Sequence, residues 1–259
     1  MSALPVLRPT GAHLGPIAAR PRFGVLQGRG AGRTYEPVFI PKIVCPPQPG
    51  EGDLWKIGIF AGIHGDEQAG TLACFELMEW IGGRPTGLDG FEIHLYPVCN
   101  PTGSRDGTRE SRHGLDLNRE FWKDSACPEV RYLERELRRE NYHGILSLHA
   151  DDTSEGVYGF VSGALLSEHI LEPALAAAAT VLPRNESAVI DNFPARHGII
   201  SEGYNGVLSA PPEQRPHALE VVFETPALAP LSDQIRATVL AVKTMLAEFR
   251  TLQAYAPNL

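Results

Sequence analysis

The sequence lacks an excess of basic residues and lacks any long apolar run. Its 23 lysine and arginine residues are outnumbered by 31 aspartate and glutamate residues, which gives a net charge of −8. Phosphate backbones and anionic lipid surfaces bind basic faces, so this balance disfavours nucleic acid and membranes as partners. No apolar stretch approaches the ~18 residues that a membrane-spanning helix needs. We therefore predict a soluble protein, in which a local cationic pocket for a small ligand stays compatible with the negative total charge.

Paired cysteines and an export signal are also missing. None of the four cysteines forms a CxxC pair, which argues against a cysteine-based zinc site and against a disulfide scaffold. Cys74 and Cys99 lie among apolar residues, as buried thiols do. Residues 1–20 contain three prolines and no continuous apolar segment, so they do not resemble a signal peptide. These absences predict a cytoplasmic protein.

The composition is that of an ordinary folded domain. Hydrophobic residues make up 43% of the chain and charged residues 21%, and the 259 residues fit a single α/β domain. Apolar runs of strand length alternate with amphipathic stretches, which predicts a central mixed, mostly parallel, twisted β-sheet flanked by helices on both faces. We predict one domain over residues 1–259, with residues 1–30 irregular. The predicted strands cover 38–44 (an edge strand, because of Pro41), 54–63, 91–95, 145–148, 157–161 and 219–223; the predicted helices cover 67–80, 165–181 and 231–249, another begins at Pro128, and residues 100–118 form a long loop.

Three apolar runs end in residues that bind metals or move protons. His64 and Glu67 follow the first run. His149 follows the second run, and Glu224 follows the third. Because the carboxyl ends of parallel strands share one edge of a sheet, we expect these residues to meet. Two imidazoles and a carboxylate with an open fourth position suit a hydrolytic zinc site, in which Glu224 serves as general base and then as acid. Each signal alone has a plainer interpretation, since an HxxE pair is weak and a lone histidine or glutamate suits a strand end or a turn.

A polar segment between these residues carries three further motifs. Asn100-Pro-Thr-Gly103 is followed by Gly107-Thr-Arg109 and then by Gly114-Leu-Asp-Leu-Asn-Arg-Glu-Phe121. Together with the HxxE pair, the strand-end histidine and the late glutamate, these motifs resemble the zinc carboxypeptidase superfamily, which includes murein peptide amidases, succinylglutamate desuccinylases and aspartoacylases. The resemblance spans roughly residues 30–250 and includes Gly32-Arg33. The form His64-Gly-Asp-Glu67 is more similar to the murein peptide amidase branch than to the digestive enzymes.

The resemblance implies one zinc ion per chain and a role for each matching residue. These roles are His64, Glu67 and His149 as zinc ligands; Glu224 as general base; Asp116 as the carboxylate that orients the first zinc histidine; Asn118 and Arg119 as the pair that holds a substrate carboxylate; Arg109 as the group that stabilises the oxyanion, with Arg112, near the bound substrate, and Arg105 as alternatives; and Tyr204 as a mobile side chain that closes over the substrate. Two of these assignments have competing interpretations. Arg119 also suits a structural salt bridge, and Tyr204 also suits an ordinary surface loop.

The resemblance further implies a zinc-dependent metallopeptidase or amidase. Such an enzyme hydrolyses an amide bond next to a residue with a free carboxylate, as in a cell-wall peptide, with zinc and Glu224 activating the water. Two alternatives stay open, namely a deacylase of N-acyl amino acids and a non-catalytic zinc-binding domain that recognises a peptide C-terminus. Asp66 and Glu120 depart from the residues that other members have at these positions. The sequence therefore determines neither the substrate nor the oligomeric state.

Overall fold

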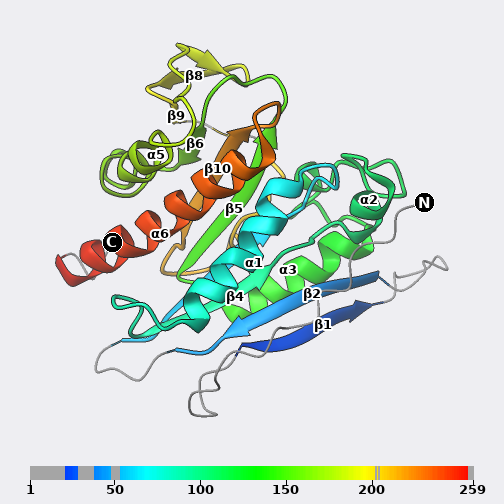
Figure 1. Ribbon diagram of the computed structural model, residues 1–259. Helices are drawn as coiled ribbons and strands as arrows, with labels where there is room; N and C mark the ends of the chain where they lie inside the picture. The colour runs from blue at the N-terminus through cyan, green and yellow to red at the C-terminus, as the bar shows by residue number, and fades with distance from the viewer. Residues whose placement is uncertain (1–20, 29–37, 48–52, 202, 204, 256–259) are drawn as a thin grey trace.

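The computed structural model describes residues 21–28, 38–47, 53–201, 203 and 205–255 (Figure 1). Its strands form a sheet in the order β1-β2-β4-β3-β5-β10-β6-β9-β8-β7. The central strands β4, β3, β5 and β10 run parallel, while β2 and β6 flank them in the antiparallel direction. The elements are β1 (Arg22–Gly28), β2 (Val38–Cys45), β3 (Trp55–Ala61), α1 (Gln68–Gly82), β4 (Phe91–Tyr96), α2 (Pro101–Asp106), η2 (Leu117–Arg119), α3 (Pro128–Glu140), β5 (Gly144–Asp151), β6 (Tyr158–Val161), α4 (Ala164–Leu166), η3 (Ser167–Leu171), α5 (Glu172–Ala178), β7 (Val189–Ile190), β8 (Phe193–Arg196), β9 (Ile199–Ile200), β10 (Leu219–Pro226) and α6 (Leu231–Tyr255).

Helices cover both faces of this sheet (Figure 1). On one face, α1, α5 and α6 bury apolar side chains such as Leu77 and Met245 against the strands. On the other face, α3 does the same through Leu133 and Leu137. The predicted mixed α/β sheet with helices on both sides is therefore confirmed. None of the described helices is both long and apolar enough to cross a membrane.

The N-terminal part of the sheet differs from the expectation. Residues 22–28 fall in the segment predicted to be irregular, but they form β1, which pairs antiparallel with β2. β2 is consequently an interior strand, and its prediction as an edge strand was wrong. Its pairing with β4 begins at Ile43, so Pro41, which has no N–H to donate, lies beyond that ladder.

Residues 100–118 contain helical turns rather than the predicted continuous loop. The side chain of Asn100 accepts a hydrogen bond of 2.9 Å from the Gly103 N–H and so caps α2. Gly107, at a φ of 67°, ends this helix. Asp116 then caps η2 in the same way as Asn100 caps α2. Helices this short contain too few turns to produce the apolar periodicity from which the sequence prediction was made.

The C-terminal half also contains elements that the sequence prediction missed. The helix predicted over residues 165–181 is divided into α4, η3 and α5 and ends at Ala178. β10 continues to Pro226, so Glu224 lies inside this strand, opposite His149 of β5. The strands β7, β8 and β9 are two to four residues long, and such lengths leave almost no alternation to detect.

A buried network of ion pairs attaches α3 to the sheet. Lys42 Nζ, on β2, donates hydrogen bonds to Glu136 Oε1 at 2.6 Å and to Glu140 Oε1 at 2.9 Å. Lys56 Nζ, on β3, donates to Glu140 Oε2 at 2.9 Å. Because Lys42 and Glu136 are both buried, each charge depends on the other to offset its loss of water.

His94 belongs to the same network. It is buried, with Nδ1 2.8 Å from Tyr142 Oη and Nε2 3.0 Å from Glu92 Oε1. Glu92, His94 and Glu140 lie close enough to suggest a metal site. The ammonium group of Lys42 already neutralises Glu140, however, so ion pairs account for this cluster.

His94 is expected to make the fold sensitive to mild acid. Burial and the charges of Lys42 and Lys56 lower its pKa, and the carboxylates of Glu140 and Glu92 only partly oppose this, so that the pKa is about 4. An unfolded histidine has a pKa near 6.5, so between these values only the unfolded chain binds the proton. The free energy of unfolding should therefore fall by up to about 3 kcal/mol as the pH drops from 6.5 to 4.

Urea unfolding at a series of pH values across this window measures the loss. The His94→Gln variant should lack this part of the pH dependence, whereas glutamine in place of the exposed His217 should retain it. Identical pH profiles for the wild type and His94→Gln would contradict the prediction.

Candidate metal centre

The carboxyl ends of β3, β5 and β10 meet at one edge of the sheet, where β5 lies between the other two strands. β3 ends at Ala61, and the chain then turns through Gly62, which has a φ of 61°, to reach His64. On the neighbouring strands, His149 lies opposite Glu224. The sheet therefore brings residues from three separate parts of the sequence to one place, as parallel strand ends require.

His64, Glu67 and His149 form a compact, buried group of potential metal ligands. His64 Nδ1 lies 2.5 Å from Glu67 Oε1, and His149 Nδ1 lies 3.0 Å from Glu67 Oε2. The two Nδ1 atoms are 3.3 Å apart. Ligand atoms bound at about 2.05 Å to a tetrahedral zinc ion are about 3.3 Å from one another, so the two ring nitrogens have the separation that zinc needs. These residues fit a zinc ion in donor type and in the separation of the two ring nitrogens, whereas the oxygens of Glu67 lie closer to the rings than zinc ligands do, at 2.5 and 3.0 Å.

The charges in this group also suit a cation. Burial would raise the pKa of Glu67, but the charge and hydrogen bonds of His149 and His64 lower it to about 2. Glu67 is therefore a carboxylate at neutral pH. The two Nδ1 atoms face each other so closely that both cannot carry a proton there, so at least one of them has a lone pair available for a metal.

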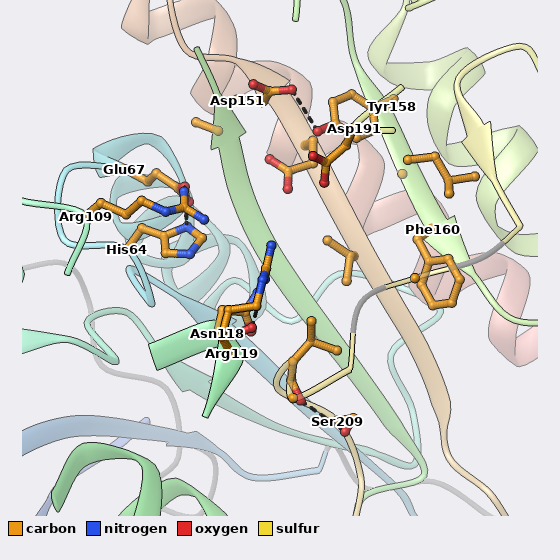
Figure 2. A pocket seen from close by; sticks show the side chains of 18 of the residues that line it. His64, Glu67, Arg109, Asn118, Arg119, Asp151, Tyr158, Phe160, Asp191 and Ser209 are labelled. Carbon is orange, nitrogen blue, oxygen red and sulfur yellow. Dashed lines mark hydrogen bonds and ion pairs between the residues drawn. The ribbon is translucent and has the colours of Figure 1, made fainter. Parts of the chain in front are cut away.

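Asp116 connects His64 to Arg109. Asp116 Oδ1 lies 3.2 Å from His64 Nε2, and Oδ2 accepts hydrogen bonds from Arg109 Nε at 3.2 Å and Nη2 at 3.0 Å. Arg109 Nη1 lies 3.3 Å from His64 Nδ1, at the ligand group (Figure 2). Burial would raise the pKa of Asp116, but the hydrogen bond and charge of His64, together with Arg109, hold it well below its usual range. Asp116 thus lies beside the first ligand histidine, and Arg109 lies beside the ligand group. These are the neighbours that their predicted roles, orienting His64 and stabilising an oxyanion, call for.

Two glycines allow the turn that carries His64 to touch the segment that carries Arg109. A Cβ atom on Gly65 would lie 2.0 Å from the carbonyl carbon of Gly103. The Gly65 N–H also donates a hydrogen bond of 3.4 Å to the Arg109 carbonyl oxygen. Because the two backbones are in direct contact, Gly65 cannot be replaced without displacing the segment that carries Gly103. A Cβ atom on Gly103 would instead lie 2.6 Å from the carbonyl oxygen of Glu110 in its own segment. This contact explains why the two glycine-containing motifs occur together.

Asn118 and Arg119 line the cavity beside the ligand group, but the side chain of Asn118 already has other partners. Its Oδ1 accepts a hydrogen bond of 2.8 Å from the Leu208 N–H, and its Nδ2 lies 3.5 Å from His149 Nε2. Asn118 therefore joins the ligand strand to the loop at residues 205–209. Arg119 is half-buried and donates from Nη1 to the Asn118 carbonyl oxygen at 2.9 Å.

The cavity has a volume of about 990 Å³, and its lining is divided by charge. Arg109 and Arg119 lie on one side, whereas Asp151 and Asp191 lie at the other end beside Tyr158 (Figure 2). Tyr158 Oη donates a hydrogen bond of 2.9 Å to Asp151 Oδ2. A ligand that fills this space would meet cationic groups at one end and carboxylates at the other.

Glu224 lines the cavity and lies opposite His149 in the pairing of β10 with β5. Burial raises the pKa of Glu224, and the charge of His149 opposes this rise. The carboxylates of Glu67, Asp151 and Asp191 add to it, and the resulting pKa is about 8. A carboxyl group with a pKa near neutral can both take up a proton and return it.

The two alternatives to Arg109 lie away from the cavity. Arg105 is exposed and pairs with Asp106 at 2.7 Å, and Arg112 is also exposed. Neither of them lines the cavity, so of the three arginines only Arg109 reaches the ligand group. Tyr204 and the Gly32-Arg33 pair lie outside the described residues.

Sequence reasoning missed three residues at this site, namely Ser147, Tyr158 and Asp191. Ser147 had a usable signal, because it precedes His149 by two residues in a strand and therefore shares its face. Tyr158 and Asp191 had none, since no motif marks them and only the pairing of β6 with β10 and the fold of the following segment bring them to the cavity.

Residues 54–189 match the family model of the succinylglutamate desuccinylase/aspartoacylase catalytic domain. No curated protein sequence matches the chain. The match covers the elements from β3 to α5 and the segment that follows, and it includes the three candidate metal ligands.

Solved structures of three bacterial proteins have a similar fold. A provisionally assigned metallopeptidase from Shewanella denitrificans has a TM-score of 0.72 at 21% identity, over 88% of this chain and 83% of its own. A succinylglutamate desuccinylase/aspartoacylase from Rhodobacter sphaeroides has a TM-score of 0.62 at 16% identity, over 91% and 67%. A metallo-carboxypeptidase from Pseudomonas aeruginosa has a TM-score of 0.60 at 19% identity, over 88% and 63%. At these identities the likeness concerns the fold alone.

Proposed function

Because the chain belongs to the succinylglutamate desuccinylase/aspartoacylase family of hydrolases, we propose that it hydrolyses the amide bond of an N-acyl amino acid with the help of one bound zinc ion. The observation that carries the proposal is the convergence of His64, Glu67 and His149 beside Glu224, at a cavity that holds a small molecule. The family match favours a deacylase over an enzyme for cell-wall peptides. The presence of Glu224 argues against a non-catalytic binding domain, because such a domain needs no proton-transfer group.

Each residue of the ligand group has a distinct part in this proposal. His64 and His149 would hold the ion through ring nitrogens, and Glu67 would hold it through its carboxylate. When bound, zinc lowers the pKa of a water molecule and polarises the amide carbonyl. Glu224 takes a proton from the attacking water and passes it to the amide nitrogen as the carbon–nitrogen bond breaks. The products are the free carboxylate of the acyl group and the free amine of the amino acid.

Two arginines bind the charged parts of the substrate in this proposal. Arg109 has its guanidinium anchored by Asp116 and its Nη1 at the ligand group, where it can stabilise the oxygen of the scissile carbonyl. Arg119 presents a planar guanidinium that suits the free carboxylate of the amino acid. Asn118 supports this wall through its contact with Leu208. Tyr204 stays a prediction, and Arg112 is exposed and does not line the cavity, so no role in binding is proposed for it.

The acidic end of the cavity supports a narrower proposal, in which the amino acid carries a positively charged side chain. Asp151 and Asp191 lie there, opposite the arginines (Figure 2). The Pseudomonas aeruginosa metallo-carboxypeptidase is in complex with (2-guanidinoethylmercapto)succinic acid. That compound carries a cationic guanidinium at one end and carboxylates at the other. A substrate with the same division of charge would complement both ends of this cavity.

A panel of substrates tests the proposed function. The zinc-loaded protein is incubated with N-acetyl and N-succinyl derivatives of lysine and of norleucine, and with short peptides, and release of free amine is measured. We expect the acyl amino acids to be hydrolysed, and the lysine derivatives faster than the norleucine derivatives. Hydrolysis of the peptides alone would favour a carboxypeptidase instead. A protein that binds zinc but hydrolyses no amide in the panel would contradict the proposal.

Arg119→Met is expected to raise KM for the preferred acyl amino acid roughly 10- to 100-fold. This follows from the loss of hydrogen bonds to a charged group, which contribute about 1.5–3 kcal/mol. The control is the methyl ester of the same substrate, which has no carboxylate to lose and should react equally well with both proteins. Similar losses on the acid and on its ester would show that Arg119 does not bind the carboxylate.

A further inference from the structure

Ser147 lies directly behind a ligand histidine. Ser147 and His149 are two residues apart in β5, so their side chains project from the same face of the sheet. Ser147 Oγ lies 3.0 Å from His149 Nε2, on the opposite side of the ring from the Nδ1 atom that faces Glu67. Both residues are only 3% exposed, so this contact is shielded from solvent.

The groups around His149 Nε2 determine which atom can accept a hydrogen bond from an Nε2–H group. Besides Ser147, Asn118 lies nearby, with Nδ2 3.5 Å from Nε2. The orientation of this amide is fixed, because its Oδ1 accepts a hydrogen bond of 2.8 Å from the Leu208 N–H. The NH₂ group of Asn118 is therefore the side of the amide that lies near His149, and this group cannot accept a hydrogen bond from Nε2–H. Among the described residues, the acceptor available to an Nε2–H group is the hydroxyl of Ser147.

We infer that Ser147 is a positioning residue of the metal centre, which accepts a hydrogen bond from His149 Nε2–H and keeps the Nδ1 lone pair directed at the ion. A neutral imidazole carries one N–H, so a proton held on Nε2 leaves Nδ1 free to bind a metal. Partners of this kind fix the ring orientation and the tautomer of ligating histidines. The inference rests on the proposed zinc centre, but it is independent of the substrate.

The two ligand histidines have partners of different charge. Asp116, a carboxylate, lies behind His64, whereas a neutral hydroxyl lies behind His149. The guanidinium of Arg109 pairs with Asp116, so the carboxylate behind His64 has a charged partner of its own. A hydroxyl at position 147 orients the second histidine without placing a further charge in a buried part of the site, where a charge is costly to bury.

Ser147→Ala is expected to weaken the binding of Zn²⁺ by about 10- to 100-fold, the usual effect of losing such a partner. Competition with a chromophoric chelator measures this dissociation constant on the full chain, without any substrate. Ser147→Thr keeps the hydroxyl and should bind zinc nearly as well as the wild type. The matched control is Ser125→Ala, which removes another buried serine hydroxyl, one that donates to Glu120 instead. Its zinc affinity should equal that of the wild type.

A spectroscopic measurement separates positioning from packing. In the zinc-loaded, ¹⁵N-labelled protein, His149 Nε2–H should give a slowly exchanging signal in the wild type and in Ser147→Thr, and should lose this protection in Ser147→Ala. If the alanine variant does not fold, Ser147→Cys replaces it, and its weaker acceptor should give an intermediate zinc affinity. Equal affinities in the wild type and in the variants without the hydroxyl would overturn the inference and leave the proposed function intact. A wild-type chain that binds no zinc would overturn both.

Discussion

Replacement of Glu224 by glutamine is expected to lower kcat/KM by about 10²- to 10⁴-fold, which is the usual contribution of a general acid–base group. Glutamine has nearly the shape of glutamate but cannot take a proton from water. Glu224 lies within the strand ladder opposite His149, so an isosteric substitution should leave the backbone unchanged. The rate of amine release from the best acyl amino acid, measured at several substrate concentrations, checks this prediction.

Zinc content and stability show whether the loss is chemical or structural. The Glu224→Gln variant should bind zinc, and its metal-free form should melt no earlier than the wild type. The reason is that burial and the neighbouring carboxylates of Glu67, Asp151 and Asp191 disfavour a charge at this position, and glutamine carries none. Glutamine in place of the exposed Glu213 serves as the control and should keep full activity. Full activity in Glu224→Gln would mean that another group acts as the base.

Removal of the metal is expected to abolish hydrolysis and to lower the melting temperature by roughly 8–16 °C. Zinc at about 1,000 times its dissociation constant stabilises the folded state by about 4 kcal/mol. Each kcal/mol shifts the melting temperature of a domain of this size by about 2–4 °C. Calorimetry and activity assays before chelation, after chelation and after zinc is restored measure both effects.

Single ligand variants make this experiment specific to the proposed centre. His64→Ala and His149→Ala each remove one ligand, so zinc should no longer raise their melting temperatures. His217→Ala removes an exposed histidine and should respond to zinc as the wild type does. Undiminished hydrolysis by protein shown to contain no metal would rule out the proposed role of zinc.

The elements that carry the candidate ligands were predictable because their signals are local. The apolar runs before His64 and before His149 are each properties of a single backbone segment. β1 was not predicted because its own sequence carries no strand signal that we recognised, and it is defined in the structure by its pairing with β2. Pro41 led to the wrong prediction of an edge strand for the same reason. The effect of a proline depends on which strand pairs with that part of β2, and the sequence does not show this.

By itself, the sequence determined the donor types and their order. His64 and Glu67 lie one turn apart after a strand, His149 ends another strand, and the motifs around residues 100–121 indicate the family to which the chain proved to belong. Such features are chemical identities and short spacings, which exist before the chain folds.

Only the tertiary structure decided which neighbours serve these donors. Arg105, Arg109 and Arg112 are chemically alike, and the choice among them depends on Asp116, which holds one of them against the ligand group. The hydroxyl of Ser147 behind His149 and the acidic end of the cavity were likewise decided by the structure. The physical reason is that these contacts join segments far apart in the chain, or side chains whose directions depend on the register of the sheet.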